Sequence, residues 1–238
     1  SPQPLAGQQE IAARGNQLYQ EGEYVAAIEA YETVVEAGFE SGDLYYNLGN
    51  AYFKSGDLGR SILQWERALV RSPGDPDVIA NLELARTLTV DAVEPLPRLF
   101  LFEAVDWWVG LFPRGVLIAV VLFAWLMMTG GGMLRVLARS EWASRLGYWF
   151  VVAGGLTGFV LGTNLLVREV GIGRPERAVI MVEVVAVRSA PAEDDDLTLF
   201  EVHEGTTVRI DQRTGAWVEV VLDDGKVGWV PLAAMELI

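Results

Sequence analysis

Residues 47–57 read NLGNAYFKSGD, and the pattern of small, aromatic and turn residues around this stretch also occurs earlier in the chain. A fixed period is typical of stacked helix pairs, in which small residues lie where helices touch and aromatic residues fill the gaps. The sequence therefore predicts two repeats, at 8–41 and 42–75. The matching pairs, each 34 positions apart, are Gly15-Asn16 and Gly49-Asn50, Gly22 and Gly56, Ala27 and Ser61, Tyr31 and Trp65, and Val34 and Ala68.

The 34-residue period resembles the tetratricopeptide repeat, with Pro73 where the second repeat ends. A third stretch, DVIANLELARTL at 77–88, places Val78, Leu82 and Ala85 at helical spacing. It predicts a capping helix at 76–89 that seals the hydrophobic face of the last repeat. Residues 1–94 are thus expected to form an α-helical solenoid.

The resemblance implies a protein-binding groove, because the first helix of each tetratricopeptide pair lines the concave side. Amide side chains in such a groove can both donate to and accept from a peptide backbone. We expect the groove positions to lie outside the core between the helices. They are Asn16, Tyr19, Gln20, Tyr46, Asn50, Phe53 and Lys54.

Tetratricopeptide repeats that hold chaperone C-termini use two asparagines and several basic groups to clamp two carboxylates. The asparagines would be Asn16 and Asn47 here. The basic positions are occupied by Ala12, Asp77 and Asn81 instead. A different protein contact is therefore expected.

The middle of the chain contains two long apolar stretches. Residues 115–134 and 147–167 are 20 and 21 residues long and hold no charged side chain. Each would form a helix of about 30 Å, which matches the hydrocarbon thickness of a bilayer. The alternative, a buried core hairpin, is disfavoured because two such runs seldom lie so close together in a soluble core. Interfacial anchors lie near the ends: Trp107, Trp108, Trp142, Tyr148 and Trp149.

The segments around these two transmembrane helices are predicted to be an interfacial helix and linker at 95–114, a short loop at 135–146 and a linker at 168–177. The second span carries a small residue at every fourth position, a pattern that lets helices approach closely. Alternatively, glycine is simply common in membrane helices. The three positions are Gly154, Gly158 and Gly162.

From residue 178 onward the hydrophobic period changes to two, as in short strands separated by turns. Four pieces resemble the bacterial SH3-like (SH3b) domain: AVRSAP at 186–191, HEGTTVRI at 203–210, GAWVEV at 215–220 and DGKVGWV at 224–230. Residues 178–238 are thus expected to form an all-β SH3-like barrel. Trp217 and Trp229 are candidate contacts for a peptide or a cell-wall stem, unless they mainly pack the barrel.

Composition excludes several classes of function. The net charge of −14 divides into −9, +3 and −8 over residues 1–94, 95–178 and 179–238, which disfavours nucleic-acid binding. The chain has no cysteine and a single histidine, His203, without a metal-binding or triad partner. The acidic run at 193–196 lacks the spaced ligands of a calcium loop. We therefore expect no enzymatic activity, no cofactor and no metal.

The order of repeats, helix pair and SH3b domain resembles the BatE family of bacterial aerotolerance operons, with NLGNAYFKSGD, NLELAR at 81–86 and DGKVGWV as the most similar pieces. This resemblance implies an inner-membrane scaffold that works with von Willebrand A-type Bat proteins and, indirectly, a MoxR-type AAA+ ATPase. An alternative is a receptor that docks peptidoglycan through the SH3b domain. A hydrolase is disfavoured because no nucleophile and base occur in a recognisable motif.

Two spans would place both soluble domains on one side of the membrane. The chain begins Ser-Pro-Gln-Pro rather than with Met, which is typical of cleavage by signal peptidase and equally of a shortened chain. Cleavage would make that side the periplasm.

Overall fold

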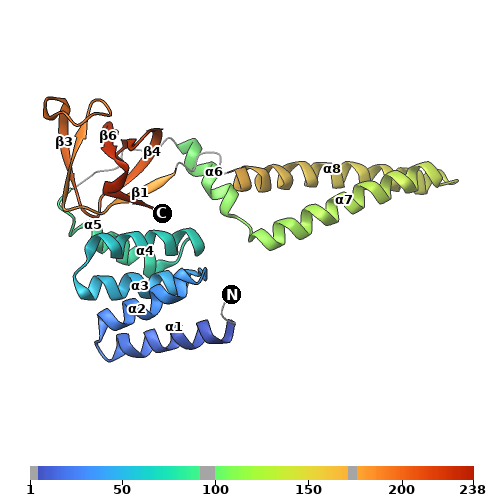
Figure 1. Cartoon of the computed structure of the whole chain (residues 1–238). Helices are drawn as coiled ribbons and strands as arrows, with labels where there is room; N and C mark the ends of the chain where they lie inside the picture. The colour runs from blue at the N-terminus through green and yellow to red at the C-terminus, as the bar shows by residue number, and fades with distance from the viewer. Residues whose placement is uncertain (1–4, 92–99, 171–175) are drawn as a thin grey trace. The chain divides into compact units, whose positions relative to one another are not determined.

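A computed structural model describes residues 5–91, 100–170 and 176–238, and the chain divides into two compact units (Figure 1). The first, which we call the repeat-barrel unit, combines 1–96 with 175–238. The second, the hairpin unit, spans 97–174. The two domains that the sequence predicts on either side of the apolar helices therefore form a single unit.

Five helices build the repeats: α1 (Leu5–Gln20), α2 (Tyr24–Glu36), α3 (Gly42–Ser55), α4 (Leu58–Arg71) and α5 (Pro76–Arg86). Short polar side chains begin the later helices by accepting hydrogen bonds from the first turn. Ser41 accepts from the backbone N–H of Leu44, and Asp57 from that of Arg60. Gly56 caps the end of helix α3, and its φ of +91° places it in the left-handed region that favours glycine.

The repeat period is visible in how the helices pack. A Cβ atom on Gly15 would lie 2.6 Å from Cε1 of Tyr31, and one on Gly49 would lie 2.6 Å from Cδ1 of Trp65. The absence of a side chain thus lets each aromatic ring lie directly on the preceding helix. The same solution at both positions explains why a glycine and an aromatic residue recur with a common offset.

The β domain is one antiparallel sheet with the strand order β3-β2-β6-β5-β4-β1-β7. Its interior is dominated by valine, including Val187, Val202, Val218 and Val230, as expected for strands with alternating burial. The strands are β1 (Arg177–Ile180), β2 (Val184–Arg188), β3 (Thr198–His203), β4 (Thr207–Thr214), β5 (Trp217–Val221), β6 (Val227–Pro231) and β7 (Met235–Leu237).

Strand β1 belongs to two cores at once. Ala178 and Ile180 point into the β domain, whereas Val179 packs in the cluster formed by α3, α4 and α5, which also contains Ile62 and Val78. All three strand residues have no exposed surface. The β domain therefore seals the open face of the last repeat, together with the predicted capping helix.

A buried ion pair also crosses this junction. The Glu66 carboxylate is 1% exposed and is held by both guanidinium nitrogens of Arg177, at 3.0 and 3.2 Å. The more exposed Arg86 approaches it at 3.4 Å. Such bidentate geometry is among the strongest side-chain interactions, and it compensates a charge that would otherwise be buried alone.

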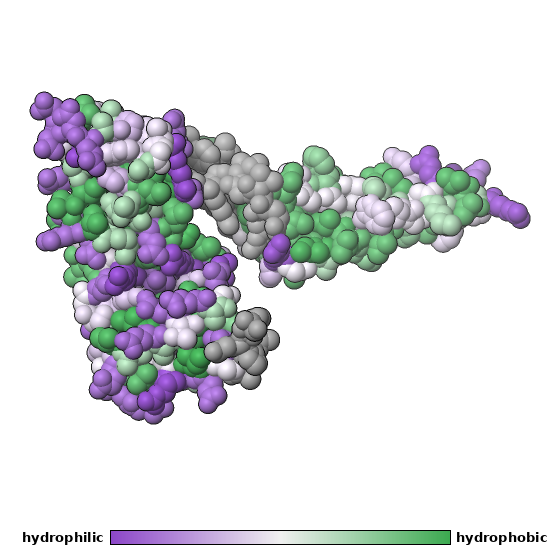
Figure 2. Space-filling view, in the orientation of Figure 1, coloured by the Kyte–Doolittle hydropathy of each residue, from purple (hydrophilic) through white to green (hydrophobic). Residues whose placement is uncertain are grey.

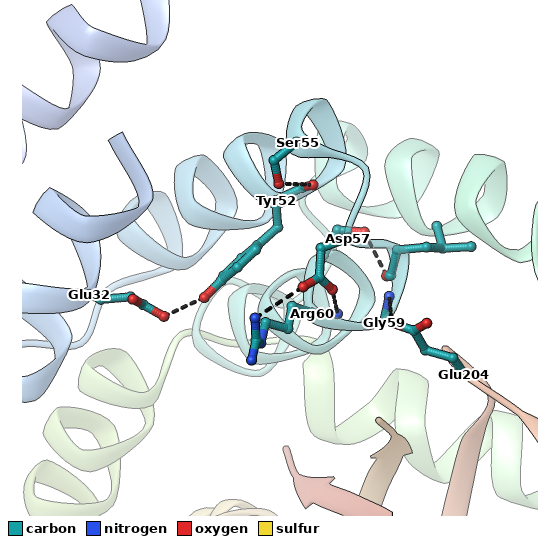
Figure 3. Close-up of polar contacts among 9 residues, drawn as sticks. Glu32, Tyr52, Ser55, Asp57, Gly59, Arg60 and Glu204 are labelled. Carbon is teal, nitrogen blue, oxygen red and sulfur yellow. Dashed lines mark hydrogen bonds and ion pairs between the residues drawn. The ribbon is translucent and has the colours of Figure 1, made fainter. Parts of the chain in front are cut away.

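A second polar cluster lies where the repeats end. The Asp91 carboxylate accepts hydrogen bonds from the backbone N–H of His203 at 2.6 Å and from the Thr206 hydroxyl at 2.7 Å, and His203 Nδ1 lies 2.9 Å from it. Burial alone would raise the pKa of Asp91, but these hydrogen bonds together lower it below the ordinary 3.8. Nearby, Glu204 accepts from the backbone N–H of Gly59 in the first turn of α4 (Figure 3).

Asp91→Asn is expected to lower the free energy of unfolding by about 2 kcal/mol at neutral pH, because a neutral amide accepts these hydrogen bonds less strongly. The native pKa is lowered, so the contribution of Asp91 is present above its ordinary value of 3.8 and is lost as the pH falls through the native pKa. The stabilities of wild type and variant should therefore converge in acid. Urea unfolding at neutral pH and well below pH 3.8 measures this, with the exposed Asp211→Asn as control; a constant difference would contradict the assignment.

The hairpin unit consists of α6 (Phe100–Gly110), α7 (Arg114–Leu137) and α8 (Glu141–Val170). The last two are long and apolar enough to cross a membrane. Both are longer than the uncharged stretches at 115–134 and 147–167, because the charged residues at their ends also adopt helical backbone. Only residues 138–140 separate them, and both helices expose many large hydrophobic side chains, which colour much of the visible face green in Figure 2.

The short helix α6 is attached to α8 by a polar contact. Asn164 is 1% exposed, and its Nδ2 donates to the backbone oxygen of Trp108 at 2.7 Å. The sequence predicts an interfacial helix and linker over 95–114, and the structure adds a hydrogen bond that holds this helix to α8 within the hairpin unit. Residues 95–99 of the predicted segment lie outside the described residues.

Candidate protein-binding surfaces

Helices α1, α3 and α5 carry a row of linked asparagines. Asn16 Oδ1 accepts from the Tyr31 hydroxyl at 2.7 Å and from Asn47 Nδ2 at 3.2 Å. Burial raises the pKa of Tyr31 to about 12, so the phenol stays protonated as a donor throughout the neutral range. The first asparagine of the predicted groove thus joins both helices of its repeat to the next repeat.

The same arrangement occurs in the second repeat. Asn50 Oδ1 accepts from Trp65 Nε1 at 3.1 Å and from Asn81 Nδ2 at 2.9 Å. Each partner lies 34 positions after its counterpart in the first repeat, so the hydrogen bonds repeat together with the sequence. We call these four residues, Asn16, Asn47, Asn50 and Asn81, the asparagine ladder.

The ladder changes the expected role of the groove residues. The acceptor oxygens of Asn16 and Asn50 already bind neighbouring helices, and Phe53 packs on Trp65 with ring centroids 5.5 Å apart. Contrary to expectation, Asn50 and Phe53 thus contribute to the core between helices. A partner would meet the outer edges of the ladder.

The remaining predicted groove residues differ in exposure. Tyr19 is half-buried against Tyr24, with ring centroids 5.4 Å apart, and Tyr46 is half-buried beside the core cluster formed by α3, α4 and α5. Gln20 and Lys54, which occupy equivalent positions in the two repeats, are exposed. These two are the side chains that can contact a partner without any loss of internal packing.

The outer face of the β domain brings the two predicted tryptophans to one side of the sheet. Their neighbours Val218 and Val230 point into the core, so Trp217 and Trp229 point outward on the adjacent strands β5 and β6. Both rings are half-buried. Trp229 lies opposite Arg188 on β2, whose guanidinium carbon is 5.3 Å from the centroid of the Trp217 ring.

Arg188 adds a largely buried positive charge to the two tryptophans on this face. Its side chain is 15% exposed, its Nε has no hydrogen-bond partner within the described chain, and Asp195 of the acidic loop lies 3.7 Å from Nη2. The cation stacks on one tryptophan and so holds it in place. The tryptophans therefore combine a packing role with an exposed edge. We call the three residues Arg188, Trp217 and Trp229 the aromatic face.

The predicted glycine row of α8 is only partly used within the chain. A Cβ atom on Gly154 would lie 2.5 Å from the backbone oxygen of Ala124 in α7, whereas one on Gly158 would make an ordinary contact at 3.9 Å. A Cβ atom on Gly162 would meet no atom of another helix within 4 Å among the described residues. The close approach of α7 and α8 also depends on Gly131 and Gly147. These two glycines do not belong to the row with one glycine at every fourth position.

Comparison with known families identifies both parts of the repeat-barrel unit. Residues 12–76 match the tetratricopeptide repeat family, and residues 181–235 match the bacterial SH3 domain family. The chain carries a tetratricopeptide repeat and a bacterial SH3 domain. The predicted fold class, a helical repeat region, two apolar helices and an SH3-like β domain, is confirmed. No curated protein matches the chain.

The tetratricopeptide repeat and the SH3 domain are typically non-catalytic modules that bind proteins or peptides. In the described ranges 5–91, 100–170 and 176–238, no group of three or more His, Asp or Glu side chains is arranged to hold a metal ion. The SH3 domain also explains one motif of the sequence. A Cβ atom on Gly228 of DGKVGWV would lie 2.5 Å from Val187, so glycine is required where β6 meets β2.

Sequence reasoning missed three charged residues that organise the unit. In the sequence, Glu66 and Asp91 look like ordinary surface carboxylates. Arg188 is the last residue of the short strand β2, and no sequence pattern indicates its partner. One signal was available for the ladder, because Asn47 and Asn81 show the same 34-residue offset as Asn16 and Asn50. No signal of comparable strength existed for Glu66, whose counter-ion lies 111 positions away.

Proposed function

We propose that the chain is a membrane-anchored adaptor that holds partner proteins on its repeat-barrel unit. The observation that carries this proposal is the junction between the two interaction modules, with the bidentate contact of Glu66 and Arg177 and the buried Val179. One body thereby presents the asparagine ladder and the aromatic face together. Helices α7 and α8 supply the anchor, since each is long enough to cross a bilayer.

The setting that we propose is a bacterial inner-membrane complex of the Bat type, linked to stress or oxygen tolerance. The order of tetratricopeptide repeat, apolar helix pair and SH3 domain supports this, as does the resemblance to BatE in three separate stretches. The partners would be von Willebrand A-type Bat proteins, with a MoxR-type AAA+ ATPase bound indirectly. Mechanical work and metal-dependent adhesion would belong to these partners.

The adaptor role is tested by cross-linking in native membranes, purification of the tagged full-length chain, and mass spectrometry. We expect von Willebrand A-type proteins among the captured partners. Lys54→Glu should reduce their recovery severalfold without loss of folding, because this side chain is exposed on α3 and belongs to the predicted groove. Val25→Thr, at an exposed position of α2, serves as the control. Recovery of no such protein would contradict the Bat setting.

Reporter fusions after residue 94 and at residue 238 are expected to give the same topology signal. The physical reason is that residues 5–91 and 176–238 share one core, so they lie on one side of the membrane. We propose the periplasm, with the connection that contains Arg135, Arg139 and Arg145 in the cytoplasm. Alkaline phosphatase, which is active only after export, should be active at both positions. Activity at only one position would show that one of the two helices does not cross the membrane.

A second candidate function, docking to peptidoglycan, is favoured by the aromatic face alone. Its test requires the whole chain in detergent, because an isolated β domain would expose Val179. We expect no saturable binding to purified sacculi at low salt, since the acidic SH3 domain would repel negatively charged wall polymers. Saturable binding that Trp229→Ala abolishes in a folded protein would instead favour the wall receptor.

A further inference from the structure

A pocket on the side of the repeats formed by α2, α3 and α4 belongs to neither surface described so far. The last strand, β7, contributes Glu236 to its rim, and Val35, Leu48 and Leu63 supply apolar lining. Polar groups of four kinds surround this lining: carboxylates, guanidinium groups, a phenol and an amide. The pocket is thus suited to a ligand with both an aliphatic part and a polar end.

The charges around the pocket are unequally compensated. Arg67 donates to Glu236 at 2.9 Å and to the backbone oxygen of Leu237 at 2.8 Å, and Arg60 pairs with Asp57 at 3.1 Å. Both cations are therefore already neutralised by groups of the chain. Any charge in the pocket that the chain itself does not neutralise must therefore come from other side chains.

That charge comes from two glutamates of α2. Within the part of the chain that the structure describes, neither Glu32 nor Glu36 forms an ion pair. Glu32 accepts a hydrogen bond from the Tyr52 hydroxyl (Figure 3), and Glu36 is exposed at the rim. The pocket therefore has an excess of negative charge and of acceptor groups.

An unpartnered buried amide provides an independent indication of a ligand. Gln64 lines the pocket and is only 7% exposed, and its Oε1 has no hydrogen-bond partner among the described residues. A buried acceptor without a donor has lost its hydration and gained no hydrogen bond in exchange, which destabilises the fold. Because this oxygen is itself buried, the amide must turn it toward the pocket before the N–H groups of a ligand can supply the missing donor.

We propose that this pocket binds a lysine or arginine side chain from an extended basic segment of a partner protein. Val35 and Leu63 would cover the methylene stem, while Glu32, Glu36 and Gln64 would accept from the charged end. The net charge of −14 would steer such a segment toward the unit. The inference rests on the proposed adaptor function and adds a second docking position to it, away from the asparagine ladder.

The test uses full-length protein in nanodiscs and fluorescence anisotropy with a labelled, end-blocked Ala-Ala-Arg-Ala-Ala peptide. The same peptide with citrulline, the neutral isostere of arginine, is the matched probe. We expect saturable binding of the arginine peptide only. Glu36→Gln should weaken it about threefold, and Glu32→Gln together with Glu36→Gln about tenfold, because each change removes one uncompensated charge.

Glu83→Gln on α5 is the matched control, since it removes one exposed charge outside the pocket and should leave the affinity unchanged. Gln64→Met provides a second measurement. It should leave thermal stability equal or higher, because an unpartnered buried amide is replaced, yet lower the affinity about threefold. Absent saturable binding, equal affinity for the citrulline peptide, or equal effects of Glu36→Gln and Glu83→Gln would each overturn the proposal. These results are independent of whether Bat-type proteins co-purify.

Discussion

Arg177→Met is expected to lower the free energy of unfolding of the repeat-barrel unit by about 3 kcal/mol. The substitution leaves the Glu66 carboxylate, which is 1% exposed, with only the 3.4 Å contact to Arg86. Removal of one partner of a buried ion pair is costly because the remaining charge has lost its hydration and its counter-ion. Chemical denaturation of the full chain in detergent, followed by tryptophan fluorescence, measures the change.

Two further variants distinguish the ion pair from a general effect of arginine loss. Arg86→Met should cost less than about 1 kcal/mol, because Arg86 is 56% exposed and solvent screens its charge. Glu66→Leu introduced into Arg177→Met should recover most of the lost stability, since an apolar pair no longer leaves a charge buried. If Arg86→Met and Arg177→Met are equally destabilising, the pair does not hold the junction.

Gly49→Leu is expected to unfold the tetratricopeptide repeats, at a cost of about 3 kcal/mol or more. Even the first side-chain atom would lie 2.6 Å from Trp65 Cδ1, so the ring must move. Movement of the ring would also break the hydrogen bond from Trp65 Nε1 to Asn50 that belongs to the asparagine ladder. Circular dichroism and amide hydrogen exchange of α3 and α4 measure the loss.

Lys54→Leu, an equally large apolar change on the exposed side of the same helix, should leave the midpoint of thermal unfolding within a few degrees of wild type. A graded series strengthens the test: Gly49→Ala already introduces the 2.6 Å contact and should destabilise less than leucine. Full retention of the native amide protection in Gly49→Leu would show that the ring has another position to occupy.

The elements with a clear period were predictable from the sequence. The offset between Gly15 and Gly49 fixed the repeats, because each glycine accommodates an aromatic ring and the geometry must recur in every helix pair. Trp217 and Trp229 were placed on strands because their neighbours alternate with valine. The two apolar helices followed from length and the absence of charge alone. The SH3-like β domain followed from four motif pieces in the expected order.

The junction was not predictable, since its signals are not periodic. Residues 177–181 read RAVIM, a continuous apolar run after one arginine, and a strand buried on both faces has no alternation that distinguishes it from a linker. Glu66 occupies an ordinary helical position. The sequence around it therefore does not reveal that it is buried against Arg177. The asparagines of the groove were identified, but their hydrogen-bond partners depend on the distance between helices, which the sequence does not state.

The shared core has a consequence for the order in which the protein is made. Glu66 emerges from the ribosome 111 residues before Arg177, and α7 and α8 must be synthesised between them. During that interval Ile62 and Val78 lack the strand that covers them, so the second repeat remains open to proteases and chaperones. Completion of the fold therefore requires that the C-terminal domain reach the same compartment as the repeats. If α7 and α8 span the membrane as proposed, correct insertion of both helices becomes a condition for completing the fold. A molecule with only one helix inserted would then keep the second repeat uncovered.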